Sequence, residues 1–304
     1  MTRALIVGYG SIGQRHASCL ADLSCDVAVV SQQSNITLRS FTKLEEAVAV
    51  VAPDYVVVAN ETARHAATIE ALAATSFRGA LLVEKPLSDK PYHPPAALFA
   101  KFAIAYNLRF HPVVTALRQR LQQTPVLAVH VSVGQHLADW RPGRDFHATY
   151  SASREQGGGV LRDLSHELDY LLWLFGPWRR VAALGGCTGA LGIAADEYWS
   201  ILCEFERAPI AHLRLSYLDR PARREIVITT AAATLQADLI ANTLTINGVI
   251  ETFAVDRNSS YRAMHHAMLD TGPNQLCSAL EGEAANDLIA AIETAASARQ
   301  WVTP

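Results

Sequence analysis

Residues 4–20, ALIVGYGSIGQRHASCL, decide the fold of the first part of this chain. The apolar run 4–7 predicts a short buried strand, and residues 13–23 are expected to form a helix. The glycines between them permit a tight turn and a close approach of a pyrophosphate to the backbone, and the helix N-terminus adds N–H donors and a positive dipole. We therefore predict a dinucleotide site with contacts from Gly8, Gly10, Ser11, Ile12 and Gly13. The alternative is a fold that retains the glycine turn but binds no cofactor.

The first third of the sequence alternates between segments typical of strands and of helices. Strands are expected at residues 4–7, 26–30, 55–59 and 80–83, and helices at 13–23, 44–51 and 62–74. The apolar stretch after Lys101 is expected to supply the last strand of the same sheet. Such alternation indicates a doubly wound parallel sheet, and the consecutive valines at 56–58 are typical of a strand buried on both faces. We assign residues 1–110 to an N-terminal α/β dinucleotide-binding (Rossmann) domain.

The pattern changes from about residue 126. Strands without intervening helices are expected at 126–133, 199–205, 210–217, 224–230, 234–239 and 244–246. Asn247-Gly248 is typical of a hairpin turn between two of the later strands. One main helix is expected from Gly159 to Phe175, ending at Gly176-Pro177. Residues 111–304 are therefore predicted to form an α+β domain built on a large, mostly antiparallel open sheet.

Composition excludes several classes of protein. The chain has 304 residues, which exceeds the usual size of one hydrophobic core and favours two domains. A formal net charge of −3 gives no attraction toward nucleic acid or anionic membranes, and no apolar stretch reaches membrane-spanning length. The five cysteines show neither metal-type pairing nor a disulfide framework, which fits reduced thiols in the cytoplasm. Histidines 65, 111, 147 and 166 lie in different elements, so we expect no metal site.

The end of the second predicted strand bears on the choice between the two nicotinamide cofactors. Folds that bind NAD normally place an acidic residue here to hold the ribose 2′-hydroxyl, whereas this chain has Val30-Ser31-Gln32-Gln33. Without that carboxylate a 2′-phosphate meets no repulsion, and Ser31, Gln32 or Arg39 could donate to it. We therefore favour NADP over NAD, although hydroxyl and amide donors also bind NAD.

Lys85 stands in Glu84-Lys85-Pro86, directly after the predicted strand 80–83. Open α/β sheets bind ligands at the carboxyl ends of their strands, so this ammonium is expected at the cofactor edge, with its backbone restricted by the proline. Such a cation is a candidate catalytic group. Taken alone, the tripeptide is also compatible with an ordinary loop and a solvated lysine.

A second polar cluster lies in residues 157–169, GGGVLRDLSHELD. Helical spacing would place Asp163 and His166 on one face, with Asp169 one turn further along. A carboxylate one turn before a histidine can fix its tautomer and stabilise the protonated ring, which suits a general acid or base near neutral pH. The alternative is a polar helix face after a glycine run.

Five stretches of the chain, in this order, resemble the Gfo/Idh/MocA oxidoreductase family. They are GYGSIGQRHA at 8–17, VVVANETARHA at 57–67, VEKPL at 83–87, AYNLRFHP at 105–112 and GGGVLRDLSHELDYLLWLFG at 157–176. The resemblance implies an NAD(P)-dependent dehydrogenase or reductase of CH–OH groups, in which Lys85 and His166 face the reacting sugar carbon and Asp163 supports them. It extends the cofactor contacts to Asn60, Glu61, His65, Glu84 and Lys85. The spacing departs from the family pattern, because two residues rather than three separate Asp163 from His166.

The resemblance also implies a substrate and an assembly. The implied substrate is a sugar, a cyclitol or a sugar nucleotide, and more weakly a modified amino sugar of surface polysaccharide synthesis. The residues expected to contact it are Arg109, Trp140, Arg144, Tyr150, Asp163 and His166. A homodimer or homotetramer through the second-domain sheet is expected. Two alternatives stay open: a solvated loop at 140–145, and a non-catalytic NAD(P)-binding sensor or regulator on the same fold.

Overall fold

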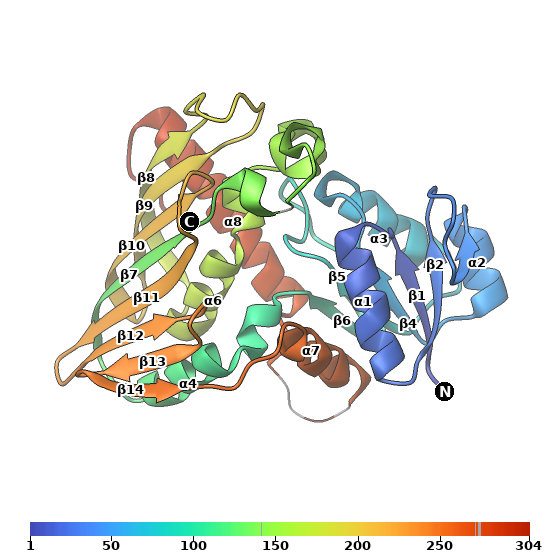
Figure 1. Ribbon diagram of the computed structural model, residues 1–304, viewed down its shortest axis with the longest axis horizontal. Helices are drawn as coiled ribbons and strands as arrows, with labels where there is room; N and C mark the ends of the chain where they lie inside the picture. Colours follow the sequence, from blue (N-terminus) through green and yellow to red (C-terminus); the bar gives the residue numbers. More distant parts are fainter. Residues whose placement is uncertain (141, 271, 273–274) are drawn as a thin grey trace. The chain divides into compact units, whose positions relative to one another are not determined.

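The computed structural model describes residues 1–140, 142–270, 272 and 275–304 (Figure 1). The chain divides into two compact units. The first comprises Met1–Phe110 and Arg257–Glu283, and the second comprises His111–Asp256 and Ala284–Pro304. The expected division had one boundary, after residue 110. Residues 257–283, which we had assigned to the second domain, instead pack with the first unit.

A six-stranded sheet, in which each strand is parallel to its neighbours, forms the centre of the first unit. Its strands are β1 (Arg3–Val7), β2 (Asp26–Val30), β3 (Arg39–Phe41), β4 (Tyr55–Val58), β5 (Ala80–Val83) and β6 (Lys101–Ile104). The order β3-β2-β1-β4-β5-β6 reverses direction between β1 and β4, where open α/β sheets bind ligands. Every residue of β4 is buried, as expected for a strand covered on both faces. The predicted Rossmann sheet is confirmed.

The strands of this sheet end in register at one edge. Val7 pairs with both Val30 and Val58. Val58 pairs with Val83, which in turn pairs with Ile104. The residues that directly follow these strands therefore emerge at the same carboxyl edge, and this places the turn after β1 and the lysine after β5 on one side of the unit.

Helices cover the sheet of the first unit. They are α1 (Ser11–Asp22), α2 (Leu44–Val51), α3 (His65–Ala74) and α7 (Ser259–Leu269), with short 3-10 turns at Thr62–Arg64, Ala96–Leu98 and Asn107–Phe110. The buried side of the sheet toward α1 and α7 includes Ile6, Val29 and Val57, together with Leu20 of α1 and Met264 of α7. α7 belongs to the late segment of the chain and completes this core.

An eight-stranded sheet dominates the second unit (Figure 1). Its strands are β7 (Val126–Gly134), β8 (Trp178–Gly186), β9 (Tyr198–Phe205), β10 (Ala208–Ser216), β11 (Arg223–Thr230), β12 (Thr234–Asp238), β13 (Thr243–Ile246) and β14 (Val249–Thr252). Their order is β14-β13-β12-β11-β7-β10-β9-β8, and only the β7–β10 pair is parallel. Asn247 and Gly248 both have positive φ and join β13 to β14 in a tight hairpin. The mostly antiparallel open sheet is thus confirmed.

Helices pack on one face of this large sheet (Figure 1). They are α4 (Pro112–Leu121), α5 (Val160–Asp163), α6 (His166–Phe175) and the later part of α8 (Ala279–Ala298), with 3-10 turns at Leu137–Trp140, Phe146–Ala148, Tyr150–Ala152 and Arg154–Gln156. Every helix in the described part of the chain is too short or too polar to cross a lipid bilayer.

The expectation of one helix from 159 to 175 was wrong. Leu164, with φ −99° and ψ 28°, leaves the helical conformation, and the N–H of Ser165 bonds the carbonyl of Arg162 three residues back. The chain therefore forms α5, a turn, and α6. Contacts made by α5 at both of its ends, described below, override the continuous helical pattern of the sequence.

Candidate active site

The glycine turn after β1 can hold only glycine at two of its positions. Gly8 has φ +99°, and a Cβ on it would lie 2.6 Å from the backbone nitrogen of Asn60. A Cβ on Gly13 would lie 2.1 Å from the carbonyl oxygen of Gly8. The first glycine therefore allows β1 to approach the end of β4, and the last allows α1 to pack against the turn.

The start of α1 has the properties of an anion site. Gly10 is its N-cap and supplies no side-chain cap, and a Cβ on Gly10 would meet nothing within 4 Å. Ser11 and Ile12 open the helix, and its first turn, all of it described, contains no acidic residue. Open space in front of uncapped N–H groups fits the pyrophosphate of a dinucleotide.

The ribose end of the predicted cofactor site lies where β2 ends beside β3. The Ser31 N–H donates to the carbonyl of Phe41 at 2.9 Å. The Gln32 side-chain amide donates to the carbonyl of Thr42 at 2.9 Å. The Arg39 guanidinium carbon lies 5.3 Å from the centre of the Phe41 ring, so this cation extends along β3 toward its carboxyl end. Ser31 and Arg39 thus have donors at this edge, while the Gln32 amide already has an acceptor.

Lys85 follows β5 and is joined to Pro86 by a cis peptide bond. The preceding Glu84 is buried, and one of its carboxylate oxygens accepts the Lys85 N–H at 3.0 Å. The other oxygen lies 2.8 Å from Nε2 of His16 in α1. Burial raises the pKa of Glu84, but the hydrogen bond and charge of His16, with a smaller effect of Lys85, outweigh it and leave this pKa lowered. Glu84 is therefore ionised, and it anchors the backbone at Lys85.

Three further predicted cofactor residues, Asn60, Glu61 and His65, lie between the end of β4 and the first residue of α3. His65 is buried, and its two ring nitrogens lie 3.0 Å from the carbonyl of Pro86 and 3.1 Å from that of Asn60. Burial lowers the pKa of His65, and the neutral ring, which has one N–H, donates to one of these two carbonyls and packs against the other. Glu61 is exposed and pairs with Arg64 at 3.4 Å. His65 thus holds this part of the edge in place, and cofactor contact by these residues stays a prediction.

Arg109, predicted to bind substrate, is 1% exposed. Its guanidinium donates to a carboxylate oxygen of Glu281 at 2.7 Å and to the carbonyl of Leu276 at 3.3 Å. These contacts join the 3-10 turn after β6 to the first turn of α8, so Arg109 has a structural role inside the first unit. A role in substrate binding stays a prediction.

In the second unit, two tyrosines hold Asp163. The hydroxyl of Tyr150 donates to one carboxylate oxygen and that of Tyr217, at the end of β10, to the other, each at 2.5 Å. Trp140 packs edge-on against the Tyr217 ring, with centroids 5.2 Å apart, and its indole N–H bonds the carbonyl of Gln135. Three of the predicted site residues are therefore brought together through Tyr217, which was not predicted.

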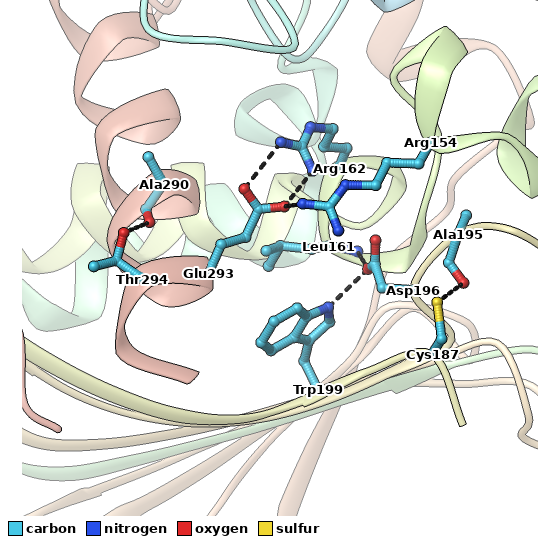
Figure 2. A network of polar contacts seen from close by, with 10 residues as sticks. All are labelled: Arg154, Leu161, Arg162, Cys187, Ala195, Asp196, Trp199, Ala290, Glu293 and Thr294. Atoms are coloured by element: carbon cyan, nitrogen blue, oxygen red, sulfur yellow. Dashed lines mark hydrogen bonds and ion pairs between the residues drawn. The ribbon is translucent and has the colours of Figure 1, made fainter. Parts of the chain in front are cut away.

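The start of α5 is fixed by Asp196 (Figure 2). One of its carboxylate oxygens accepts the Leu161 N–H at 2.9 Å and the Trp199 indole N–H at 2.7 Å. Gly159 has φ +116°, and a Cβ there would lie 2.0 Å from the other oxygen. The glycine that precedes the helix therefore allows Asp196 to approach the backbone, and Asp196 takes the place of a side-chain N-cap.

An ion-pair group supports the same helix from α8 (Figure 2). Arg162 donates to both carboxylate oxygens of Glu293, at 2.7 and 3.2 Å. Arg154, which is largely exposed, lies 3.7 Å from the same carboxylate. The two-point contact fixes the direction of Arg162 and so helps to set the orientation of Asp163, the next residue.

His166 is the first residue of α6 and is mostly buried. The neighbouring Glu167 is fully buried, and its carboxylate lies 3.1 Å from Nε of Arg224 on β11. The predicted loop residue Arg144 is exposed, and Arg141 in the same loop lies outside the described residues. Within the described residues, no three histidine, cysteine or acidic side chains cluster in a way that could hold a metal ion.

Sequence reasoning did not find several residues of these sites. His16 lies on the buried side of α1, three positions after Gly13. That spacing from the glycine turn is the one feature of the sequence that points to a role for His16. Tyr217 and Asp196 lie far from α5 in the sequence and match no local pattern.

Solved structures with similar folds include several sugar dehydrogenases. The WlbA dehydrogenase from Bordetella pertussis, in complex with NADH and UDP-GlcNAcA, is 18% identical with a TM-score of 0.81, covering 100% of this chain and 98% of the other. A UDP-N-acetylglucosamine 3-dehydrogenase from Acidithiobacillus ferrooxidans is 20% identical, with a TM-score of 0.78 and 98% of each chain covered. An oxidoreductase from Thermotoga maritima is 17% identical, with a TM-score of 0.83, covering 99% and 98%. At these identities the likeness shows the fold.

The sequence itself identifies the family. No curated protein matches the chain. Residues 2–98 match the family model described as the oxidoreductase family with an NAD-binding Rossmann fold, and residues 116–236 match the GFO/IDH/MocA C-terminal domain. Together the two matches span both sheets. The chain therefore belongs to the Gfo/Idh/MocA family of oxidoreductases, with an NAD-binding Rossmann fold in its N-terminal part.

Proposed function

We propose that this oxidoreductase transfers hydride between a nicotinamide cofactor and a secondary alcohol or ketone of a sugar, cyclitol or sugar nucleotide. The proposal rests mainly on the arrangement of residues at the carboxyl edge of the first sheet. Lys85 follows β5 at the edge where the glycine turn follows β1, and Glu84 anchors its backbone. A cation beside a nicotinamide site suits a reaction in which negative charge develops on a substrate oxygen.

The chain's own groups account for the proton and the charge. A bound nicotinamide would supply the acceptor or the donor of hydride. In the oxidation direction, the substrate hydroxyl proton passes to the His166 imidazole, and the Lys85 ammonium stabilises the charge that develops on the oxygen. Lys85 and His166 could also exchange these roles. Asp163, fixed by two tyrosine hydroxyls, is proposed as the supporting carboxylate.

We propose NADP as the preferred cofactor, with NAD as the alternative. Ser31 stands where an acidic residue would repel a 2′-phosphate. The Arg39 guanidinium, aligned over the Phe41 ring, supplies a cation at the same end of the sheet. Michaelis constants for the two cofactors test this directly, and a strong preference for NAD would contradict it.

Among these substrates, we propose a sugar nucleotide that carries an amino sugar. The fixed indole of Trp140 offers an apolar face for a sugar ring, and the exposed Arg144 offers a cation for phosphate or carboxylate. A structural neighbour of this fold is described in complex with UDP-GlcNAcA, which agrees with this class. Arg109 is the least accessible of the residues proposed to bind substrate.

We also propose a homodimer or homotetramer assembled through the large sheet. The face of this sheet away from its helices carries Leu127 on β7, Leu202 on β9 and Ile210 on β10, each about half exposed or more. Exposed apolar side chains on an open sheet favour association. Light scattering would measure the mass in solution, and a monomer at every protein concentration would contradict the proposal.

The decisive experiment measures turnover and cofactor binding separately. The purified protein is incubated with NAD or NADP and a panel of sugars and sugar nucleotides, and the absorbance of the reduced cofactor is followed. We expect Lys85→Ala and His166→Ala each to abolish turnover while cofactor binding stays normal. Lys90→Ala and His266→Ala, at exposed positions, serve as matched controls. Normal turnover in both active-site variants would remove the enzymatic interpretation, and binding without turnover of any substrate would favour a sensor.

A further inference from the structure

Four buried side chains form one continuous row of hydrogen bonds behind the backbone of Lys85. The Tyr55 hydroxyl on β4 lies 2.9 Å from Nδ1 of His265 on α7. Nε2 of His265 lies 2.9 Å from Nδ1 of His16, and Nε2 of His16 lies 2.8 Å from Glu84. The other oxygen of Glu84 accepts the Lys85 N–H. The row therefore runs from the interior of the sheet to the backbone of the proposed catalytic lysine.

The ionised Glu84 fixes the direction of the first bond in the row. A carboxylate can only accept, so Nε2 of His16 carries a hydrogen and donates to it. The other two bonds run in one of two directions. Either Nε2 of His265 donates to Nδ1 of His16 and its Nδ1 accepts from the Tyr55 hydroxyl, or Nε2 of His265 accepts from His16 and its Nδ1 donates to the Tyr55 oxygen. In both arrangements every group in the row has its partner and the His265 ring carries one hydrogen.

The surroundings of the row keep His265 and Tyr55 neutral. Tyr55, His16 and His265 are all fully buried, away from water. Burial, with the nearby His16, lowers the pKa of His265 well below its ordinary value. Burial raises the pKa of the Tyr55 hydroxyl well above its ordinary value. His265 and Tyr55 are therefore neutral, and each takes part in the row through hydrogen bonds and not as a charge.

We propose that His265 and Tyr55 are positioning residues for Lys85, acting through His16 and Glu84. This inference rests on the catalytic role of Lys85 in the proposed function. None of the three aromatic residues is expected to touch substrate or cofactor. Their contribution is to hold the Glu84 carboxylate in the one orientation in which it accepts from His16 and from the Lys85 N–H at the same time.

The tests use substitutions at the centre of the row. His265→Phe removes both ring nitrogens and leaves Nδ1 of His16 without its hydrogen-bond partner. His265→Gln keeps one donor and one acceptor at the end of the side chain and is expected to restore much of the function. His266→Phe, one position along α7 and exposed, is the matched control. Tyr55→Phe removes a single hydroxyl and serves if His265→Phe does not fold.

Steady-state kinetics give the first measurement. A lysine misplaced by a fraction of an ångström to about 1 Å should lower kcat by roughly tenfold to a hundredfold, because catalytic geometry is that sensitive. We expect this loss in His265→Phe, a smaller loss in Tyr55→Phe, and wild-type KM and NADH affinity in both. A purely structural role would instead lower the melting temperature and leave kcat per folded molecule unchanged, and that result would overturn the proposal.

Histidine nitrogen NMR on the active wild-type protein gives the second measurement, independent of turnover. His16→Gln and His265→Gln assign the two signals, and we expect the His265 ring to be neutral, with a hydrogen on one nitrogen, near neutral pH. A doubly protonated His265 ring would contradict the row. Lys85→Ala separates the two proposals: if it turns over normally, the proposed function fails. If it is inactive while His265→Phe keeps a wild-type kcat, only the present inference fails.

Discussion

Replacing Tyr217 with phenylalanine removes one hydroxyl from the group that holds Asp163. That hydroxyl donates to the carboxylate at 2.5 Å, and the tyrosine is fully buried, so water cannot take its place. A hydrogen bond to a charged group contributes about 1.5–3 kcal/mol. We expect Tyr217→Phe to lower the free energy of unfolding of the second unit by about 2 kcal/mol, near the middle of that range.

Tyr170 on α6 provides a matched control of the same size and burial in the same unit. Its hydroxyl is buried and has no hydrogen-bond partner within the part of the chain that the structure describes. An unsatisfied buried polar group costs about 1–3 kcal/mol, so Tyr170→Phe should be neutral or stabilising. One chemical change at two equally buried tyrosines is therefore expected to have opposite effects.

Urea unfolding followed by tryptophan fluorescence measures both variants. All five tryptophans, at 140, 173, 178, 199 and 301, belong to the second unit, so their fluorescence reports on that unit. NADH affinity should not change, because the glycine turn belongs to the first unit. A loss of stability in Tyr170→Phe equal to that in Tyr217→Phe, or no loss in Tyr217→Phe, would refute the reasoning.

Three other outcomes are expected. Gly8→Ala should destabilise the first unit by more than about 2 kcal/mol and abolish NADH binding in a fluorescence titration, since φ +99° is strained for alanine and its Cβ would meet Asn60. Arg39→Ala should raise the KM for NADP and leave that for NAD unchanged, as measured by initial rates with each cofactor. Burial raises the pKa of Glu281, but the charge of Arg109 and the hydrogen bonds from Ser278 and Arg109 together outweigh burial and leave this pKa lowered. The ionised Glu281 therefore adds stability above the unfolded pKa of about 4.3, and this stability is lost as the pH falls through the lower folded value. Urea unfolding at several acid pH values should show that loss in the wild type and not in Glu281→Gln.

Local patterns made the first sheet predictable. The turn at Gly8, the valines of β4 and the strand before Lys85 each carry their information within a few residues. β8 was missed because Trp178–Gly186 contains two arginines and ends in two glycines, which obscures its alternation. β3 is only three residues long, and α4, α7 and α8 were not assigned in advance.

Candidate site residues could be predicted only where a motif is contiguous in sequence. Lys85 and Gly13 were proposed in this way, and they lie at the carboxyl edge of the first sheet, while their roles stay predictions. The supports of the site were not found, because they depend on packing between distant elements: Tyr217 meets Asp163 from β10, and His265 meets His16 from α7. The same reason explains the break between α5 and α6, which tertiary contacts impose on a continuous helical pattern.

The first unit is assembled from two stretches of chain, with most of the second unit inserted between them. A ribosome releases residues 1–110 long before α7 exists, so for much of synthesis the nascent Rossmann sheet lacks part of its cover and His16 lacks one of its two partners, His265. The insertion therefore sets an order of events. An isolated fragment ending at residue 110 should expose core side chains and aggregate, and the first unit becomes complete only after residue 283 has been made.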